Sequence, residues 1–204
     1  MSQHSLTSLT VTDLLDAFAS SAPTPGGGSA SALSGAIGAA LLAMVAAIPK
    51  TRTGGAGERQ ALDAAAARLN ELRVKLTSLV DEDSRAYDLV SAAYKHPKAT
   101  DEEKAARKTA IQEALRAATE APLETMRACE AVLREAAIVF EHGNPNAASD
   151  VFVGTELARA GLCGAERNVA INLSGLSDEA YRQRATAEAA RLLSAGLTTR
   201  AAGD

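Results

Sequence analysis

Asp83 is the residue whose position most strongly suggests chemistry. Leu62, Leu69 and Leu76 recur every seven residues, the next step of seven reaches Asp83, and the one after it reaches Val90. Asp83 therefore lies on the apolar face of a predicted long helix, where a carboxylate loses hydration unless other groups replace it. Such a carboxylate could stabilise a cation or accept a proton, because perturbed acids cluster at functional sites. A structural carboxylate that caps a neighbouring helix or pairs with an arginine is the alternative.

A glycine-rich segment directly precedes an apolar helix. It consists of Pro25, Gly26, Gly27, Gly28 and Ser29. Glycines leave backbone N–H groups uncovered and let a ligand approach closely, and a helix N-terminus favours anionic or polar acceptor groups. No Gly-Lys-Ser/Thr follows, so the segment is not a P-loop. A substrate-binding loop and a flexible turn between helices are equally good interpretations.

Several amides and hydroxyls occur in two later segments. Asn144, Ser149 and Asp150 fall in one predicted loop, and Asn168 and Asn172 are four residues apart, hence on one face if that segment is helical. Such groups can bind the donor and acceptor edge of a polar heterocycle. Turn formation and helix capping are the alternative roles, and for Asn144 they are the favoured ones.

Few residues indicate a bound anion or metal. Arg52, with Lys50, lies in a second glycine-containing loop and could bind a carboxylate tail, although a solvated charge is the commoner explanation. The three histidines lie in the N-terminal tail or at predicted helix ends, and the two cysteines fit no zinc pattern. We therefore expect no metal and no prosthetic group.

Composition and periodicity favour an all-α fold, in a single domain spanning residues 1–204. Hydrophobic residues make up 47% of the chain, but aromatic residues only 3%. The pattern predicts a bundle of roughly six to eight helices that contains a buried small-residue helix at 30–48 and a long heptad-striped helix at 58–93. Thr100 and Glu103 form a predicted capping box that opens another helix, and Pro122 is expected to break or restart it.

Charge and hydropathy restrict the possible partners. The net charge of −4 argues against nucleic-acid binding. Segment 30–48 carries no charge and approaches the length of a membrane span, but its Ala, Gly and Ser content favours a buried helix, so we expect no membrane. Its small residues recur every four positions and would let another helix approach closely, within the protomer or across a dimer interface. The polar N-terminus lacks a signal pattern, so we expect a cytoplasmic protein.

Four stretches, in order, carry a resemblance to a known family. They are ASSAPTPGGG (19–28), DSRAY (83–87), PKATDEEKAAR (97–107), and GNPNAASD (143–150) followed by NVAIN (168–172). Together they resemble the methenyltetrahydrofolate cyclohydrolases related to the cyclodeaminase domain of formiminotransferase-cyclodeaminase. The resemblance implies an all-helical homodimer that binds folate and uses no metal. The chain departs from the family pattern in the loop at 47–57.

The resemblance also implies a reaction, the hydrolysis of 5,10-methenyltetrahydrofolate to 10-formyltetrahydrofolate. Asp83 would hold the cationic methenyl bridge and take a proton from the attacking water. The glycine-rich segment and the asparagines would position the pterin, and a basic residue would meet the glutamate tail. Two alternatives stay open: a formiminotetrahydrofolate cyclodeaminase, which would release ammonia, and a non-catalytic helical dimer that binds a folate or a partner.

Overall fold

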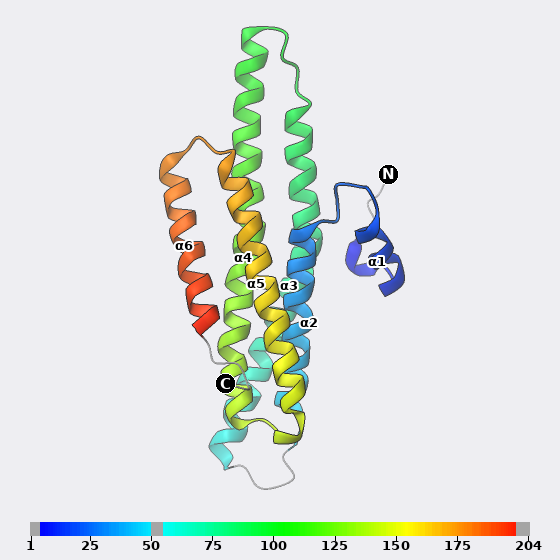
Figure 1. Ribbon diagram of the computed structural model, residues 1–204, viewed down its shortest axis with the longest axis vertical. Helices are drawn as coiled ribbons and strands as arrows, with labels where there is room; N and C mark the ends of the chain where they lie inside the picture. The colour runs from blue at the N-terminus through cyan, green and yellow to red at the C-terminus, as the bar shows by residue number, and fades with distance from the viewer. Residues whose placement is uncertain (1–4, 50–54, 199–204) are drawn as a thin grey trace.

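The structure is a computed structural model that describes residues 5–49 and 55–198. Within these ranges it contains six α-helices, two one-turn 3-10 helices and no strand, which confirms the all-α prediction. The helices are η1 (Leu6–Ser8), α1 (Val11–Ala19), α2 (Gly27–Ala47), α3 (Ala56–Tyr94), α4 (Asp101–His142), η2 (Pro145–Ala147), α5 (Ala148–Ser174) and α6 (Glu179–Thr198). From α2 onward, consecutive helices run in opposite directions, and α6 packs on the outside of the bundle formed by α2 to α5 (Figure 1).

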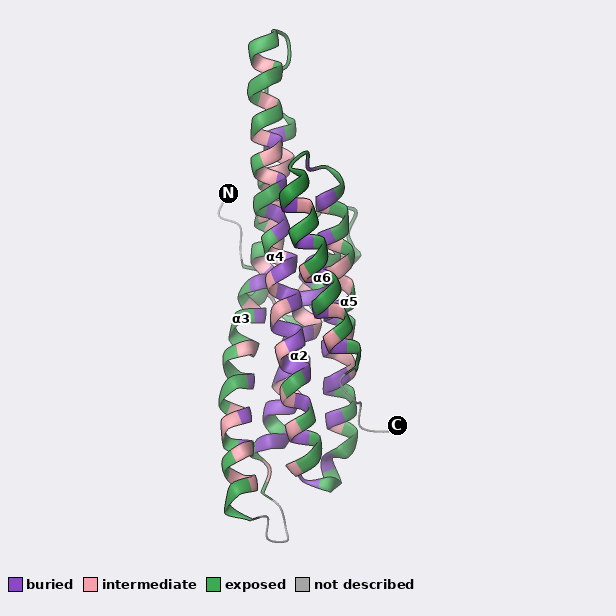
Figure 2. Cartoon of the chain, turned by 90° about the vertical axis from the view of Figure 1, so that its left-hand side faces the viewer, coloured by how far each residue is buried: buried purple, intermediate pink, exposed green. Residues whose placement is uncertain are grey.

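The small residues of α2 pack inside the protomer. The row formed by Ser31, Gly35, Ala39 and Ala43 is buried, as Figure 2 shows for the core of the bundle. A Cβ at Gly35 would overlap Sγ of Cys129 on α4, so α2 and α4 approach closely because the side chain is missing. Among the described helices, α2 alone is long and apolar enough to span a membrane, and more than half of its most apolar stretch is buried inside the bundle.

Two helix boundaries were missed or left open by the sequence prediction. Helix α2 begins at Gly27, three residues before the predicted start, so Gly27, Gly28 and Ser29 form its first turn and not a loop. Helix α5 continues to Ser174, so the segment that carries Asn168 and Asn172, whose conformation the sequence left open, is helical. Both boundaries matter for the site, because they place glycines and asparagines on rigid helices.

Pro122 lies inside α4 and does not break it, so the expected interruption is wrong. Proline has no backbone N–H, which leaves the carbonyl four residues earlier without its helical partner. That carbonyl belongs to Ala118, and Nδ2 of Asn172 on α5 donates a hydrogen bond to it at 2.9 Å. A contact from another helix therefore satisfies the group that proline leaves open. The capping box of Thr100 and Glu103 at the start of α4 is confirmed.

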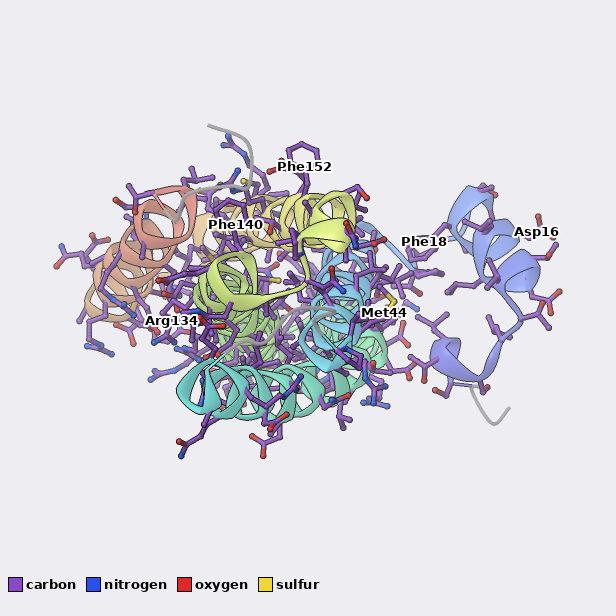
Figure 3. All side chains as sticks on the ribbon, turned by 90° about the horizontal axis from the view of Figure 1, so that it is seen from below. Asp16, Phe18, Met44, Arg134, Phe140 and Phe152 are labelled. Carbon is purple, nitrogen blue, oxygen red and sulfur yellow. The ribbon has the colours of Figure 1, made fainter. Side chains whose placement is uncertain are left out.

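Helix α1 stands apart from the bundle, and none of its residues is buried (Figures 1 and 3). It is amphipathic: Phe18 lies on the side that faces the bundle, and Asp16 lies on the opposite side (Figure 3). The preceding turn η1 is fixed to α3, because the carboxylate of Asp81 accepts hydrogen bonds from Leu6 N at 2.6 Å and from the hydroxyl of Ser5 at 2.5 Å. Asp81 thus anchors the N-terminal turn to α3.

The paired ends of α3 and α4 project beyond the other helices (Figure 1). This hairpin is largely exposed (Figure 2). Its two helices are joined by Arg107 of α4, whose Nε and Nη2 donate to the carbonyl of Tyr94 at 3.2 and 3.1 Å. The guanidinium also lies over the Tyr94 ring, 5.5 Å from its centre.

Candidate active site

The Asp83 carboxylate lies at the N-terminus of α2. The N-cap residue of this helix is Gly26, which has no side chain to accept a hydrogen bond from the free N–H groups of the first turn. Asp83, which comes from α3, takes this role: it accepts hydrogen bonds from the backbone and the side chain of Ser29, with Ser29 Oγ 3.2 Å from Oδ2. The carboxylate therefore also receives the favourable field of the helix N-terminus.

Ser29 holds this arrangement together. Its side chain is fully buried, and its Oγ lies 2.8 Å from the carbonyl oxygen of Val80 and 3.1 Å from Oγ of Ser84. The hydroxyl thus joins the first turn of α2 to the turn of α3 that carries Asp83. Ser29 was predicted to bind substrate directly, but the structure places it behind the carboxylate, where it fixes the position of Asp83.

Burial raises the pKa of Asp83, and the hydrogen bonds from Ser29 partly oppose that shift. A carboxylate whose pKa is raised holds a proton more firmly, so it is a stronger base than a solvated aspartate. A cationic ligand beside the carboxylate would oppose the effect of burial and favour the ionised form. The structure thus places Asp83 in the partly desolvated position that the heptad pattern predicted.

A cavity of about 450 Å³ opens in front of this carboxylate. Its volume is in the range typical of small-molecule sites. The N-terminus of α2, one face of α3 and the last turns of α5 form its walls, and Leu115 and Ala118 of α4 lie between them. Among the residues that the structure describes, Asp83 is the only charged side chain that lines it. The full lining is Pro23, Thr24, Gly26, Gly27, Gly28, Asp83, Ala86, Tyr87, Val90, Tyr94, Leu115, Ala118, Asn168, Ile171, Asn172, Ser174 and Gly175.

The two asparagines of α5 face the cavity together. Asn168 and Asn172 lie on one face of a continuous helix, as their spacing predicted for a helical segment. Nδ2 of Asn168 donates to the carbonyl of Gly164 at 2.9 Å, and Nδ2 of Asn172 donates to Ala118. These bonds fix the orientation of both amides, and each amide keeps a second N–H and a carbonyl oxygen for a ligand.

The structure brings half of the predicted site residues together. Gly26, Gly27, Gly28, Asp83, Asn168 and Asn172 all line the one cavity, and Pro25 lines an adjacent hollow between η1 and α3. Arg52 lies outside the described residues.

A second group of predicted residues lies at the opposite end of the bundle. Asn144 accepts a hydrogen bond from Asn146 N at 3.0 Å and donates one to the carbonyl of Pro49, so it is a turn and cap residue. Ser149 and Asp150 lie in the first turn of α5. Eighteen residues of α5 separate Asp150 from Asn168, or about 27 Å at 1.5 Å per residue. Within one protomer these three residues do not reach the cavity.

The aromatic side chains of the cavity were not among the residues predicted from the sequence to form the site. Tyr87 and Tyr94 follow Asp83 by four and eleven residues, which is the spacing of one helical face. This spacing was the feature of the sequence that could have identified both tyrosines as neighbours of Asp83. Among the described residues, no group of three or more His, Cys, Asp or Glu side chains could hold a metal ion.

The fold and the site together define an all-helical, small-molecule-binding protein whose cavity is built around one partly buried carboxylate. The chain belongs to the formiminotransferase-cyclodeaminase family, whose sequence profile matches residues 10–191.

Individual relatives agree with this assignment. The chain is 45% identical to a methenyltetrahydrofolate cyclohydrolase from Methylorubrum extorquens, over 90% of this chain and 88% of that one. It is 38% identical to formimidoyltransferase-cyclodeaminase from Sus scrofa, and this match covers 85% of the chain but 32% of the relative, so the chain spans about a third of that protein. The crystal structure of formiminotetrahydrofolate cyclodeaminase from Thermotoga maritima matches with a TM-score of 0.83 and 29% identity, covering 93% of this chain and 91% of that one.

Proposed function

We propose that this protein is a methenyltetrahydrofolate cyclohydrolase, which converts 5,10-methenyltetrahydrofolate to 10-formyltetrahydrofolate. The observation that carries the proposal is the position of Asp83, a partly buried carboxylate that, among the described residues, is the one charged group in a cavity of folate-binding size. A relative that is 45% identical and matches over 88% of its own length is named as a cyclohydrolase. The methenyl bridge is an amidinium-like cation, so a lone carboxylate is the complementary group.

The carboxylate would act in two ways. It would stabilise the cationic bridge by charge, and it would accept a proton from the water whose oxygen forms a bond to the bridge carbon. The resulting hydroxyl adduct then loses its O–H proton as the bond between that carbon and N5 breaks, and N5 takes up a proton. The products are 10-formyltetrahydrofolate and one released proton.

The cavity walls suit the rest of the pterin head. The fixed amides of Asn168 and Asn172 offer donors and acceptors to the polar edge of the ring system. Gly27, on the first turn of α2, lets a flat ring approach the backbone closely, because no side chain covers it. The binding groups thus come from helices, which hold them more rigidly than loops would.

A formiminotetrahydrofolate cyclodeaminase is the second candidate, because the matching crystal structure carries that name. The two reactions share the bridge carbon and N5, so the same carboxylate could serve both. A spectrophotometric assay for loss of the methenyl chromophore tests the cyclohydrolase directly. Ammonia release from 5-formiminotetrahydrofolate would instead establish the cyclodeaminase, and a folded protein that turns over neither substrate would favour a non-catalytic folate-binding or partner-binding dimer.

The proposal includes a homodimer that works in the cytoplasm. Helix α2 has an outward face on which Ala30, Leu33, Ile37, Ala40, Met44 and Ala47 alternate at three and four residues, and every one of them is apolar. Ile37 and Met44 are 44% and 43% exposed on that face. A three–four alternation of apolar residues is the pattern by which one helix packs along another, so a second copy would bury it. Cys163 is exposed and unpaired, which suits a reducing compartment.

A further inference from the structure

The cavity in front of Asp83 continues along α3 into a second hollow. This hollow has a volume of about 350 Å³ and is lined by Tyr87, Val90, Ser91, Tyr94 and Lys95. Three of these residues, Tyr87, Val90 and Tyr94, also line the main cavity, so the two spaces form one continuous groove. From Asp83 to Tyr94 the groove follows eleven residues of helix, or about 16 Å at 1.5 Å per residue. The groove is therefore much longer than a pterin ring alone requires.

The middle of the groove is aromatic. Aromatic residues make up only 3% of the chain, yet two of its three tyrosines lie on this single face of α3. They are 44% and 51% exposed, whereas the third, Tyr181, is buried and donates a hydrogen bond to Glu120. Exposed tyrosines seven residues apart provide flat surfaces on which an aryl ring can stack.

The far end of the groove is positively charged. Lys95, the last lining residue, follows directly after α3, and Arg107 of α4 is fixed against Tyr94 beside it. The nearby acids at the start of α4 are already engaged: Asp101 pairs with Lys104 at 2.8 Å, and Glu103 forms the capping box. Lys95 is thus the cation best placed to meet an anionic ligand that lies in the groove.

We propose that this groove binds the arylglutamate half of the substrate, with the aryl ring against Tyr87 and Tyr94 and the glutamate carboxylate at Lys95. The proposal deepens the function proposed above and rests on it. Along the groove, the order of groups is a carboxylate, then aromatic rings, then a cation. The order in a methenylfolate is a cationic bridge, then an aryl ring, then carboxylates. Each group of the ligand therefore meets a groove residue of complementary charge or polarity. Lys95 is the described residue that this proposal assigns to the tail; Arg52, predicted from the sequence for the same role, lies outside the described residues.

The test combines a charge reversal with a shortened substrate. Lys95→Glu should raise KM for 5,10-methenyltetrahydrofolate roughly tenfold, because it replaces the attraction between Lys95 and the glutamate carboxylate by repulsion. It should change kcat little, because this contact is distant from the bridge carbon. On 5,10-methenyltetrahydropteroate, which lacks the glutamate, Lys95→Glu and the unaltered protein should have the same KM. Lys98→Glu, in the same exposed turn but outside the groove lining, is the matched charge control and should behave as the unaltered protein on both substrates.

A second pair of variants tests the aromatic part. Tyr87→Ala should raise KM for both substrates, because both keep the aryl ring, whereas Leu89→Ala, an exposed residue on the same turn that does not line the groove, should not. Equal KM values for Lys95→Glu and Lys98→Glu, or an equal rise on the shortened substrate, would overturn the proposal.

Failure of the proposed function would be seen separately. If the unaltered protein turned over no methenylfolate, calorimetric binding of 5-formyltetrahydrofolate and of 5-formyltetrahydropteroate to the same variants would still test the groove. Weaker binding of only the glutamate-bearing ligand by Lys95→Glu supports the groove, and unchanged binding of both ligands rejects it.

Discussion

The carboxylate of Asp83 occupies the space in which any residue other than glycine at position 28 would carry its Cβ. A Cβ built on Gly28 would lie 2.6 Å from Oδ2 of Asp83 and closer still to Oδ1 and Cγ. The first turn of α2 and the middle of α3 therefore approach each other only because Gly28 has no side chain. This contact sets the depth at which the carboxylate lies in the cavity.

Gly28→Ala should displace Asp83 and lower turnover at least tenfold, because the carboxylate must move by an ångström or more. Gly57→Ala is the matched control, because a Cβ built on Gly57 would meet nothing within 4 Å and Gly57 does not line the cavity. Both changes replace a glycine in the first turn of a helix, α2 or α3, and should favour the helix similarly, by about 0.5–1 kcal/mol. Steady-state assays measure the turnover of both variants, and thermal melts measure their stability. Equal turnover in the two variants would show that the Asp83–Gly28 contact is dispensable.

Asp83→Asn should lower the rate by roughly two to four orders of magnitude, because it removes the charge and the basicity while keeping the shape. The folded-state pKa of Asp83 is raised, so the folded protein holds this proton more tightly than the unfolded chain, and the ionised form costs stability above that pKa. The variant should therefore melt at the same or a higher temperature at pH 7, and the difference should vanish in acid, where Asp83 is neutral in both states. Asp81→Asn, on the same helix, should keep its activity. Near-normal turnover by Asp83→Asn would end the catalytic assignment.

The pH profile of kcat/KM should have an acidic limb that belongs to Asp83. Activity should rise with pH through the raised pKa, because the base must be ionised to accept a proton. Ser29→Ala should shift this limb to higher pH, because the hydrogen bonds of Ser29 lower the pKa of Asp83. Ser34→Ala removes a comparable hydrogen bond of the same helix, from Ser34 Oγ to the carbonyl of Leu157 at 2.8 Å, and should leave the limb in place. If both variants shift the limb equally, the shift comes from a general loss of stability and not from the hydrogen bond between Ser29 and Asp83.

Ile37→Lys should convert a dimer into a monomer at micromolar concentration, because it places a charge in the middle of the apolar outward face of α2. Leu197→Lys is the control, since this residue is similarly exposed but lies on α6, on the other side of the bundle. Light scattering coupled to gel filtration measures the mass of each protein. A monomeric unaltered protein would refute the dimer outright.

Activity should be unaffected by EDTA. The prediction rests on the absence of metal-ligand spacing in the sequence and on the carboxylate chemistry proposed for Asp83. Turnover is measured after prolonged dialysis against the chelator and again after addition of zinc. Loss of activity on dialysis with recovery on zinc addition would show that the site works differently.

The sequence by itself determined most of the helices and the helix face on which Asp83 lies. Heptad spacing placed Leu62, Leu69 and Leu76 on one face, and the structure buries all three. The Thr100–Glu103 box marked the start of α4 correctly, because capping depends on residues three apart and needs no distant partner. The position of Asp83 on an apolar face followed from the same periodicity.

Only the tertiary structure decided which segments meet. Helix α2 begins at Gly27 because Asp83 of another helix caps it, and α4 continues through Pro122 because Asn172 of α5 satisfies Ala118. These partners are 54 residues apart in each case, and no local pattern specifies them.

The same limit applies to the composition of the site. Asn168 and Asn144 were both candidates in the sequence for binding a polar heterocycle, yet one lines the cavity and the other closes a turn at the far end of the bundle. Local periodicity reports which face of a helix a residue occupies. Whether that face borders a cavity depends on the way in which the long helices align against one another. Close contacts at glycines such as Gly28 and Gly35 set this alignment, because a Cβ at either position would overlap a neighbouring helix.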